Sequence, residues 1–345
     1  MPVRPDGQVL DQGMVGGQAD HDEPNDLIAD QGDRCASLAG DRRVVGQHRG
    51  RLPADPLDVG LVGIARQRLQ DGGIAPPRGP DPNRRALVHA HQYSTVEPTE
   101  LARRLGDNSG MDAATHLDWL EHESAAYAVL LAGSDLTVPV PSCPDWDLAA
   151  LTAHLGGIHR WAGGRVRGVK PEPDPAPAER AALREWFAAG ADDLLATLRT
   201  TAPDAACWTL YPPATAAFWM RRQAHETAMH RWDAELATGR QPTIDPALAA
   251  DGVAEIVQMF LPRQLQLGRM APQPGLIRLD FGDESGLLLS GDGDPTPRSP
   301  DATVSGSAET LLLVLWKRIE FEGAELSLTG DEAVVHRLLA APITP

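Results

Sequence analysis

Apolar residues recur at helical spacing in four long stretches between residues 112 and 239. The first runs from Asp112 to about Gly133, with Leu117, Leu120, Ala125, Val129 and Leu130 along one side. The third runs from about Glu179 to Arg199, with the apolar stripe Leu183, Trp186, Phe187, Leu194, Leu195 and Leu198. Four long helices joined by loops predict a bundle, in which binding sites are built from side chains that face inward.

The second and fourth helices carry the polar residues of most interest. The second follows a turn at Ser142-Cys143-Pro144-Asp145-Trp146-Asp147, whose Asp147 is a suitable N-cap, and it is expected to stop at Gly163-Gly164. A Pro-rich linker at 170–178 and a loop around Pro212-Pro213 lead to the fourth helix, which ends near Gly239.

The pattern changes after Pro274. A further helix is predicted from Asp245 to Leu261, and four short stretches then have the length and apolar content of strands: 276–281, 287–290, 302–304 and 325–328. Helices are expected at 308–318 and from residue 330 to about 340. The fold class is therefore mainly α, with a helical bundle at 111–262 and a small α+β domain at 272–345.

Residues 1–110 differ in composition from the rest of the chain. They contain no Lys, Trp or Phe, and Tyr93 is their only aromatic residue, so they have few anchors for a core. Two interpretations stay open: a disordered leader, or an extension of the gene model with the true start at Met111.

Charge and cysteine usage narrow the classes of function. The net charge of -17, with no basic stripe, disfavours nucleic acid as a partner. No apolar run reaches the roughly 18 to 20 residues of a membrane span, so we expect no membrane partner. Cys35, Cys143 and Cys207 are far apart and form no C-x-x-C pair, which favours a reducing cytoplasm. The start of the sequence shows no signal-peptide pattern, so we expect the protein in the cytoplasm.

Glu226 and His230 lie one helical turn apart, so their side chains project from the same face. Carboxylate oxygen and imidazole nitrogen are zinc ligands, and a catalytic zinc site uses three protein ligands with one open position. His154 on the second helix is the best third candidate. The alternative is an ordinary surface ion pair, because this spacing is frequent on helices. His159 and His225 are expected at the rim, and Trp146, Trp161 and Trp232 in the core.

Three blocks of sequence resemble the mycothiol-dependent maleylpyruvate isomerase family, whose metal-binding domain is a DinB-like four-helix bundle. They are Ser142 to Trp146, Ala153-His154-Leu155-Gly156-Gly157-Ile158-His159-Arg160-Trp161-Ala162, and His225-Glu226-Thr227-Ala228-Met229-His230-Arg231-Trp232-Asp233. The stretches Thr310 to Arg318 and Leu328 to Asp331 resemble that family's C-terminal domain. The resemblance covers the chain from Met111 to its end, and it implies that His154, Glu226 and His230 bind a divalent metal, Zn²⁺.

The resemblance also implies mycothiol as the cofactor and a small molecule as the substrate. A metal-bound thiolate would add reversibly to a small unsaturated diacid, so no protein cysteine is required as the nucleophile. Arg160, Arg221, Arg222 and Arg231 are candidates for holding substrate carboxylates. Two alternatives remain: a mycothiol S-transferase that acts on electrophiles, and a non-catalytic protein that binds metal or a small ligand.

Overall fold

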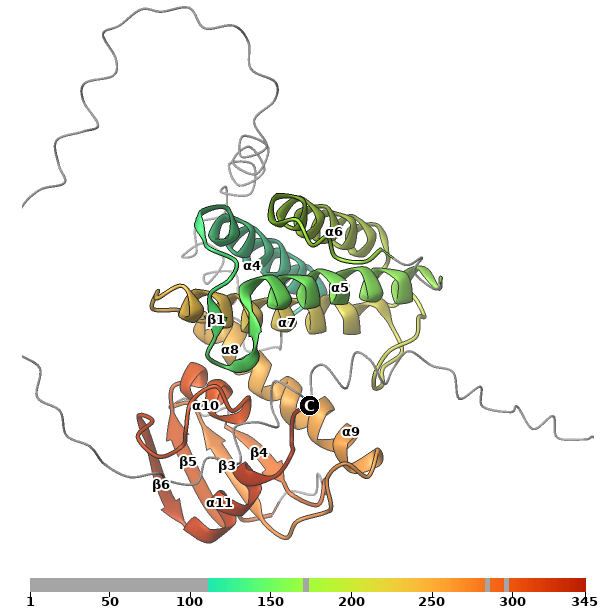
Figure 1. Cartoon of the computed structure of the whole chain (residues 1–345). Coiled ribbons are helices and arrows are strands. Elements are labelled where there is room, and N and C mark those ends of the chain that lie inside the picture. Colours follow the sequence, from blue (N-terminus) through green and yellow to red (C-terminus); the bar gives the residue numbers. More distant parts are fainter. Residues whose placement is uncertain (1–110, 170–173, 283–285, 295–297) are drawn as a thin grey trace, which may run out of the picture.

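The computed structural model describes residues 111–169, 174–282, 286–294 and 298–345 (Figure 1). The predicted leader at 1–110 and the start of the predicted linker lie outside the described residues. The rest is mainly α: a four-helix bundle followed by a small α+β part, which confirms the predicted mainly α class and its order of parts.

Four long helices form the bundle: α4 (Ala113–Gly133), α5 (Leu148–Arg167), α6 (Arg180–Thr200) and α7 (Ala216–Ala237). Helix α4 packs mainly on α7, and α5 packs on α6 and α7. Side chains cap three of the N-termini, and Asp147 accepts from the backbone N–H of Ala150 at 2.8 Å as the sequence predicts. The predicted apolar stripe of the third helix is buried along its whole length in α6.

Two details of these helices differ from the sequence prediction. Val129 is 50% exposed, because the buried face of α4 also includes Glu123 and Tyr127 and is rotated away from Val129. Helix α5 continues through Gly163 and Gly164 and ends only at Gly168, which adopts the left-handed conformation at φ 68°. A helical glycine costs about 1 kcal/mol relative to alanine, and the burial of this part of α5 outweighs that cost.

A short hairpin precedes α5 where the sequence predicts only a loop and a turn. Strand β1 (Pro139–Val140) pairs antiparallel with β2 (Cys143–Asp147). Backbone pairing therefore stabilises this segment in addition to the turn. The hairpin fixes the approach to α5 and carries Trp146 to a position beside His154, with ring centroids 4.9 Å apart.

The helix after the bundle is longer than predicted. It comprises α8 (Pro246–Glu255), the π-helical turn η2 (Ile256–Phe260) and α9 (Leu261–Gln266). The prediction ended this helix at Leu261, and the next residue, Pro262, lacks the backbone N–H of a regular helical position. In the structure, the N–H of Leu261 donates to the carbonyl of Ile256, five residues back, and the chain passes through Pro262 without leaving the helix.

The C-terminal part contains a four-stranded mixed sheet. Its elements are β3 (Leu276–Asp280), β4 (Leu287–Ser290), β5 (Ala302–Gly306), α10 (Ala308–Leu315), β6 (Leu326–Gly330) and α11 (Glu332–Ala340). The strand order is β4-β3-β5-β6, with β3 and β5 parallel and the outer pairs antiparallel. The predicted strands and helices are present, although α10 ends three residues earlier than expected.

The two parts share one hydrophobic core. Helix α8 packs against α10, and Met259 belongs to the same buried cluster as Trp232 of α7 and Leu312 of α10. The shared core places the start of the C-terminal part directly against the bundle (Figure 1). Among the helices that the structure describes, none is long and apolar enough to cross a membrane.

Candidate functional site

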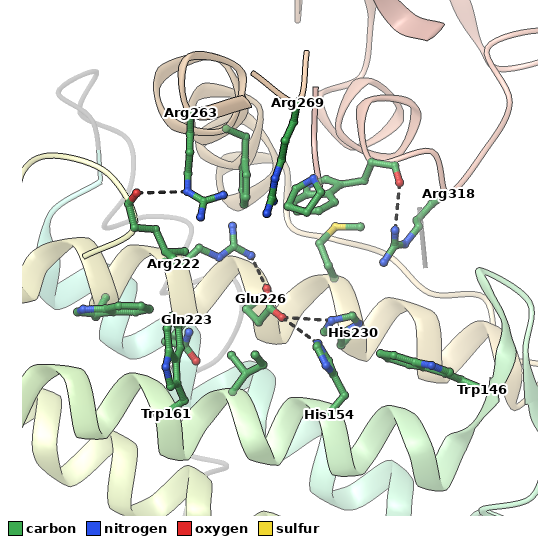
Figure 2. Close-up of a pocket in the computed structure, with 17 residues that line it drawn as sticks. Trp146, His154, Trp161, Arg222, Gln223, Glu226, His230, Arg263, Arg269 and Arg318 are labelled. Carbon is green, nitrogen blue, oxygen red and sulfur yellow. Dashed lines mark hydrogen bonds and ion pairs between the residues drawn. The ribbon is translucent and has the colours of Figure 1, made fainter. Parts of the chain in front are cut away.

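Side chains of His154 and His230 converge on one oxygen of Glu226 (Figure 2). The Nε2 atoms of His154 and His230 lie 3.5 Å and 3.3 Å from Glu226 Oε1. One ligand atom from each of the three residues lies within 4.8 Å of the others. The structure thus brings together the three residues predicted from sequence, and two imidazole nitrogens with a carboxylate oxygen are a donor set that fits Zn²⁺. Their role as metal ligands stays a prediction.

Neighbouring charged groups orient two of these three side chains. Asp233 Oδ2 lies 3.0 Å from His230 Nδ1, so the other ring nitrogen of His230 faces Glu226. Arg318 donates to both oxygens of Asp233 at 2.9 Å. Arg222 donates to Glu226 Oε2 at 2.8 Å, which leaves Oε1 for the two histidines. A carboxylate behind a metal-binding histidine is the arrangement that fixes its tautomer and raises its basicity.

Burial and neighbouring charges shift the pKa values of His154, His230 and Glu226 in different directions. Burial lowers the pKa of His154, against the opposing effect of Glu226. Burial also disfavours the charged form of His230, but hydrogen bonds to Asp233 and Glu226 outweigh it and raise the pKa to about 9. Burial opposes the ionisation of Glu226, yet hydrogen bonds from the two histidines and the Arg222 charge hold its pKa well below the ordinary value. The cluster therefore holds an ionised carboxylate in a buried setting, which suits a cation.

The cluster forms the base of a pocket between the bundle and the C-terminal part. One wall comes from β2, α5 and α7, and the other from η2, α9 and the segment after α10 (Figure 2). The pocket is lined by Trp146, His154, Ile158, Trp161, Leu210, Trp219, Arg222, Gln223, Glu226, Met229, His230, Phe260, Arg263, Arg269, Trp316, Arg318 and Pro345. The wall opposite the cluster is rich in arginine and aromatic residues.

Of the four arginines predicted as carboxylate contacts, only Arg222 lines the pocket. Arg160 pairs with Asp174, Arg221 with Asp251, and Arg231 with Glu123 and Glu235. The sequence reasoning missed three arginines of the opposite wall: Arg263, Arg269 and Arg318. Their positions depend on the packing of the C-terminal part onto the bundle, for which no local sequence pattern exists.

The prediction that His159 and His225 lie at the rim is wrong. His159 is fully buried and its Nε2 lies 3.0 Å from Thr227 Oγ1, and burial lowers its pKa to about 3. His225 is also buried, on the opposite side of α7. The prediction of a core role holds for Trp232, whereas Trp146 and Trp161 line the pocket. Helix α7 is buried on most of its circumference, which explains the error for His225, and His159 belongs to the buried face of α5.

His225 belongs to a second polar cluster that joins three helices. Asp251 Oδ2 lies 3.0 Å from His116 Nε2 and 2.7 Å from His225 Nε2. The spacing of these three side chains also suits a metal ion. However, Arg221 Nε donates to the same oxygen at 2.9 Å and already supplies a positive charge. We therefore interpret this cluster as a buried ion-pair network that ties α4, α7 and α8 together.

Comparison with known proteins identifies the family. The model of the mycothiol maleylpyruvate isomerase N-terminal domain matches residues 117–235, and the model of the C-terminal domain of the same family matches residues 247–337. Comparison with curated proteins finds no match. Two similar solved structures are the crystal structure of the mycothiol-dependent maleylpyruvate isomerase and that of a histidine-to-alanine mutant of it.

Each of these solved structures is 17% identical to the chain and covers 64% of it, and the match spans 95% of the solved chain. The TM-scores are 0.44 for the enzyme and 0.46 for its mutant. The two family models follow one another in the order of the two structural parts and together span more than half of the chain. The chain therefore belongs to the mycothiol maleylpyruvate isomerase family of enzymes.

Proposed function

We propose that this chain is a metal-dependent, mycothiol-using isomerase of a small unsaturated diacid. His154, Glu226 and His230 would hold a divalent ion, Zn²⁺. The observation that supports this proposal most directly is the convergence of their ligand atoms at the base of the pocket. Three ligands leave a position open toward the pocket, as in catalytic zinc sites.

The residues around the ligands suit a thiol at that open position. A divalent ion there supplies the charge that keeps a coordinating thiol deprotonated. Asp233 holds the tautomer of His230, and Arg222 holds Glu226 in place from its other oxygen. Trp146 packs beside His154, with ring centroids 4.9 Å apart, and lines the same pocket. Family membership supports mycothiol as the thiol.

The opposite wall suits a dianionic substrate. Figure 2 shows Arg263 and Arg269 directed into the pocket from the C-terminal part, toward Glu226. Guanidinium groups bind carboxylates with two parallel hydrogen bonds, so these arginines would fix a diacid with its double bond over the ligand cluster. A bound mycothiol would supply a nucleophilic sulfur for reversible addition to the double bond, which would leave the thiol unchanged and convert the diacid to its trans isomer.

No protein thiol is needed for this chemistry. Cys207 lies outside the pocket lining, and burial raises the pKa of its thiol, which makes the thiolate less available. Cys143 is buried in the core of the bundle. These placements agree with a nucleophile that comes from a bound cofactor.

Metal analysis tests the ligand assignment. Purified wild-type protein should contain about one equivalent of zinc per chain, and His230→Ala and Glu226→Ala should each lose it. His336→Ala is the matched control, because His336 lies partly exposed on α11, away from the pocket. Full zinc content in both ligand variants would contradict the proposal.

Product analysis tests the reaction. Incubation with mycothiol and maleylpyruvate should yield the trans isomer with the thiol recovered in full. A stable thioether that consumes mycothiol would show an S-transferase instead. Binding of metal without thiol affinity or turnover would show a binding protein.

A further inference from the structure

The pocket has a second end, where the wall formed by α5 and α7 carries no charged side chain. On α5, Trp161 lies seven residues after His154, and on α7, Gln223 lies seven residues before His230. Seven residues of helix span about 10 Å along the axis, so this end lies two turns away from the ligand cluster. On this wall the lining is apolar or aromatic apart from one amide: Ile158, Trp161, Leu210, Trp219 and Gln223. Arg263 of the opposite wall donates to the carbonyl of Leu210 at 3.2 Å.

Two buried polar atoms at this end lack partners. Trp161 Nε1 and Gln223 Oε1 are both inaccessible to solvent and have no hydrogen-bond partner among the residues that the structure describes. Gln223 as a whole is 1% exposed. An unpaired buried polar group costs about 1 to 3 kcal/mol, so such groups are normally satisfied by a ligand or water. Both residues line the pocket, Trp161 from α5 and Gln223 from α7 (Figure 2).

The surrounding tryptophans hold this end in a fixed shape. The ring of Trp161 meets the ring of Trp219 edge-on, with centroids 5.1 Å apart and an interplanar angle of 89°. Trp219 is itself anchored, because its Nε1 donates to the carbonyl of Trp208 at 2.8 Å. The direction of the Trp161 N–H is therefore set by packing rather than by a ligand.

Trp161 Nε1 and Gln223 Oε1 determine which chemical group of a ligand can hydrogen-bond to both of them. An indole N–H only donates, and an amide oxygen only accepts. A carboxylate would satisfy Trp161 but would face the oxygen of Gln223 without a proton to offer. A group that accepts one hydrogen bond and donates another, namely a secondary amide or a hydroxyl, satisfies both.

We propose that Trp161 and Gln223 form a subsite for a neutral amide or hydroxyl group, two helical turns from the ligand cluster. This inference rests on the proposed function, because it adds a subsite for a non-reacting group to the pocket that holds the ligand cluster. Mycothiol carries both amide and hydroxyl groups, and a substrate can carry a hydroxyl, so either is a possible source of the group.

Matched thiols and matched variants test the subsite. The probes are mycothiol, N-acetylcysteamine, which has a secondary amide, and ethanethiol, which has none, with Kd measured by calorimetry on the purified full chain. Trp161→Phe keeps the ring and removes the donor, and Gln223→Met keeps the length and removes the acceptor. Each should weaken mycothiol and N-acetylcysteamine about three- to tenfold, as expected for one lost hydrogen bond, and leave ethanethiol unchanged.

Trp119→Phe is the matched control. Trp119 Nε1 is also buried without a partner among the described residues, but Trp119 does not line the pocket. This variant should leave all three Kd values unchanged. If Gln223→Met fails to fold, as judged by circular dichroism, Trp161→Phe alone decides the result.

The outcomes separate the subsite from the proposed function. Wild-type protein that binds no thiol refutes the mycothiol site itself. Thiol binding that is unchanged in the variants, with a several-fold rise in the KM of the substrate, assigns the group to the substrate. An equal loss of affinity for all three thiols, or no change in thiol Kd and substrate KM, overturns the subsite.

Discussion

Replacement of Asp233 by asparagine should weaken metal binding although Asp233 is not itself a predicted ligand. Asp233 Oδ2 accepts from His230 Nδ1, which leaves His230 Nε2 facing Glu226. In Asp233→Asn, an amide N–H in place of Oδ2 would donate to Nδ1 and move the ring proton to Nε2, the atom that must bind the metal. The opposite amide orientation would place N–H groups against Arg318 Nε and Ser142 Oγ, which already donate to Oδ1.

The expected loss follows from the cost of removing a supporting carboxylate behind a metal-binding histidine. Zinc affinity should fall about 10- to 100-fold, or about 1.4 to 2.7 kcal/mol. Competition with a chromophoric chelator measures the Kd directly. Asp251→Asn is the control, because it removes a buried carboxylate of a separate cluster that also contacts a histidine. Unchanged affinity in folded Asp233→Asn, or an equal loss in Asp251→Asn, would refute this reasoning.

Three further predictions concern stability. Gly156→Ala should lower the free energy of unfolding, measured by urea denaturation, by about 1 to 3 kcal/mol, because the new Cβ would lie 2.3 Å from the Trp186 side chain. Gly157→Ala should raise it by up to about 1 kcal/mol, because nothing lies within 4 Å of that Cβ. Burial opposes the ionisation of the partly buried Asp251, but hydrogen bonds from His116 and His225 hold its pKa below the ordinary value. Its contribution to stability is therefore present above about pH 4 and is lost as the pH falls further. The difference in the free energy of unfolding between wild type and Asp251→Asn, measured by denaturation from pH 7 to 3, should narrow in acid, and a constant difference would contradict this. Removal of zinc by a chelator should lower the melting temperature by about 5 to 10 °C if zinc is present at 100 times its Kd, and the same chelator should not change the melting temperature of His230→Ala.

Helical periodicity was sufficient to predict the bundle and the candidate ligands. Glu226 and His230 share a face because four residues make about one turn, and that relation needs no tertiary information. His154 required only that a second helix pack beside the first. The sequence therefore predicted which three side chains would meet.

Features that depend on packing between distant segments could not be predicted in this way. Arg263 and Arg269 reach the pocket because the C-terminal part docks on the bundle, and their neighbours in sequence carry no signal of that contact. His225 was misplaced because α7 is buried on most sides, so a polar residue on it need not face solvent. His159 was misplaced because it lies on the buried face of α5. The buried partners of these histidines, Thr227 and Asp251, are visible only in three dimensions.

The π-helical turn η2 has a consequence for how this pocket can change. A π turn is equivalent to one extra residue inserted in an α-helix, and here it lies between α8, which packs on α10, and α9, which carries Arg263. The turn absorbs that residue locally, so deletion of one residue from Ile256–Phe260 would restore regular helix and leave α9 close to its present direction. Arg263 would still face the pocket, whereas deletion of one residue from the regular helix α8 would rotate α9 by about 100°. The turn η2 is thus a place where the chain can lose one residue and keep both the ligand cluster and the substrate-facing wall.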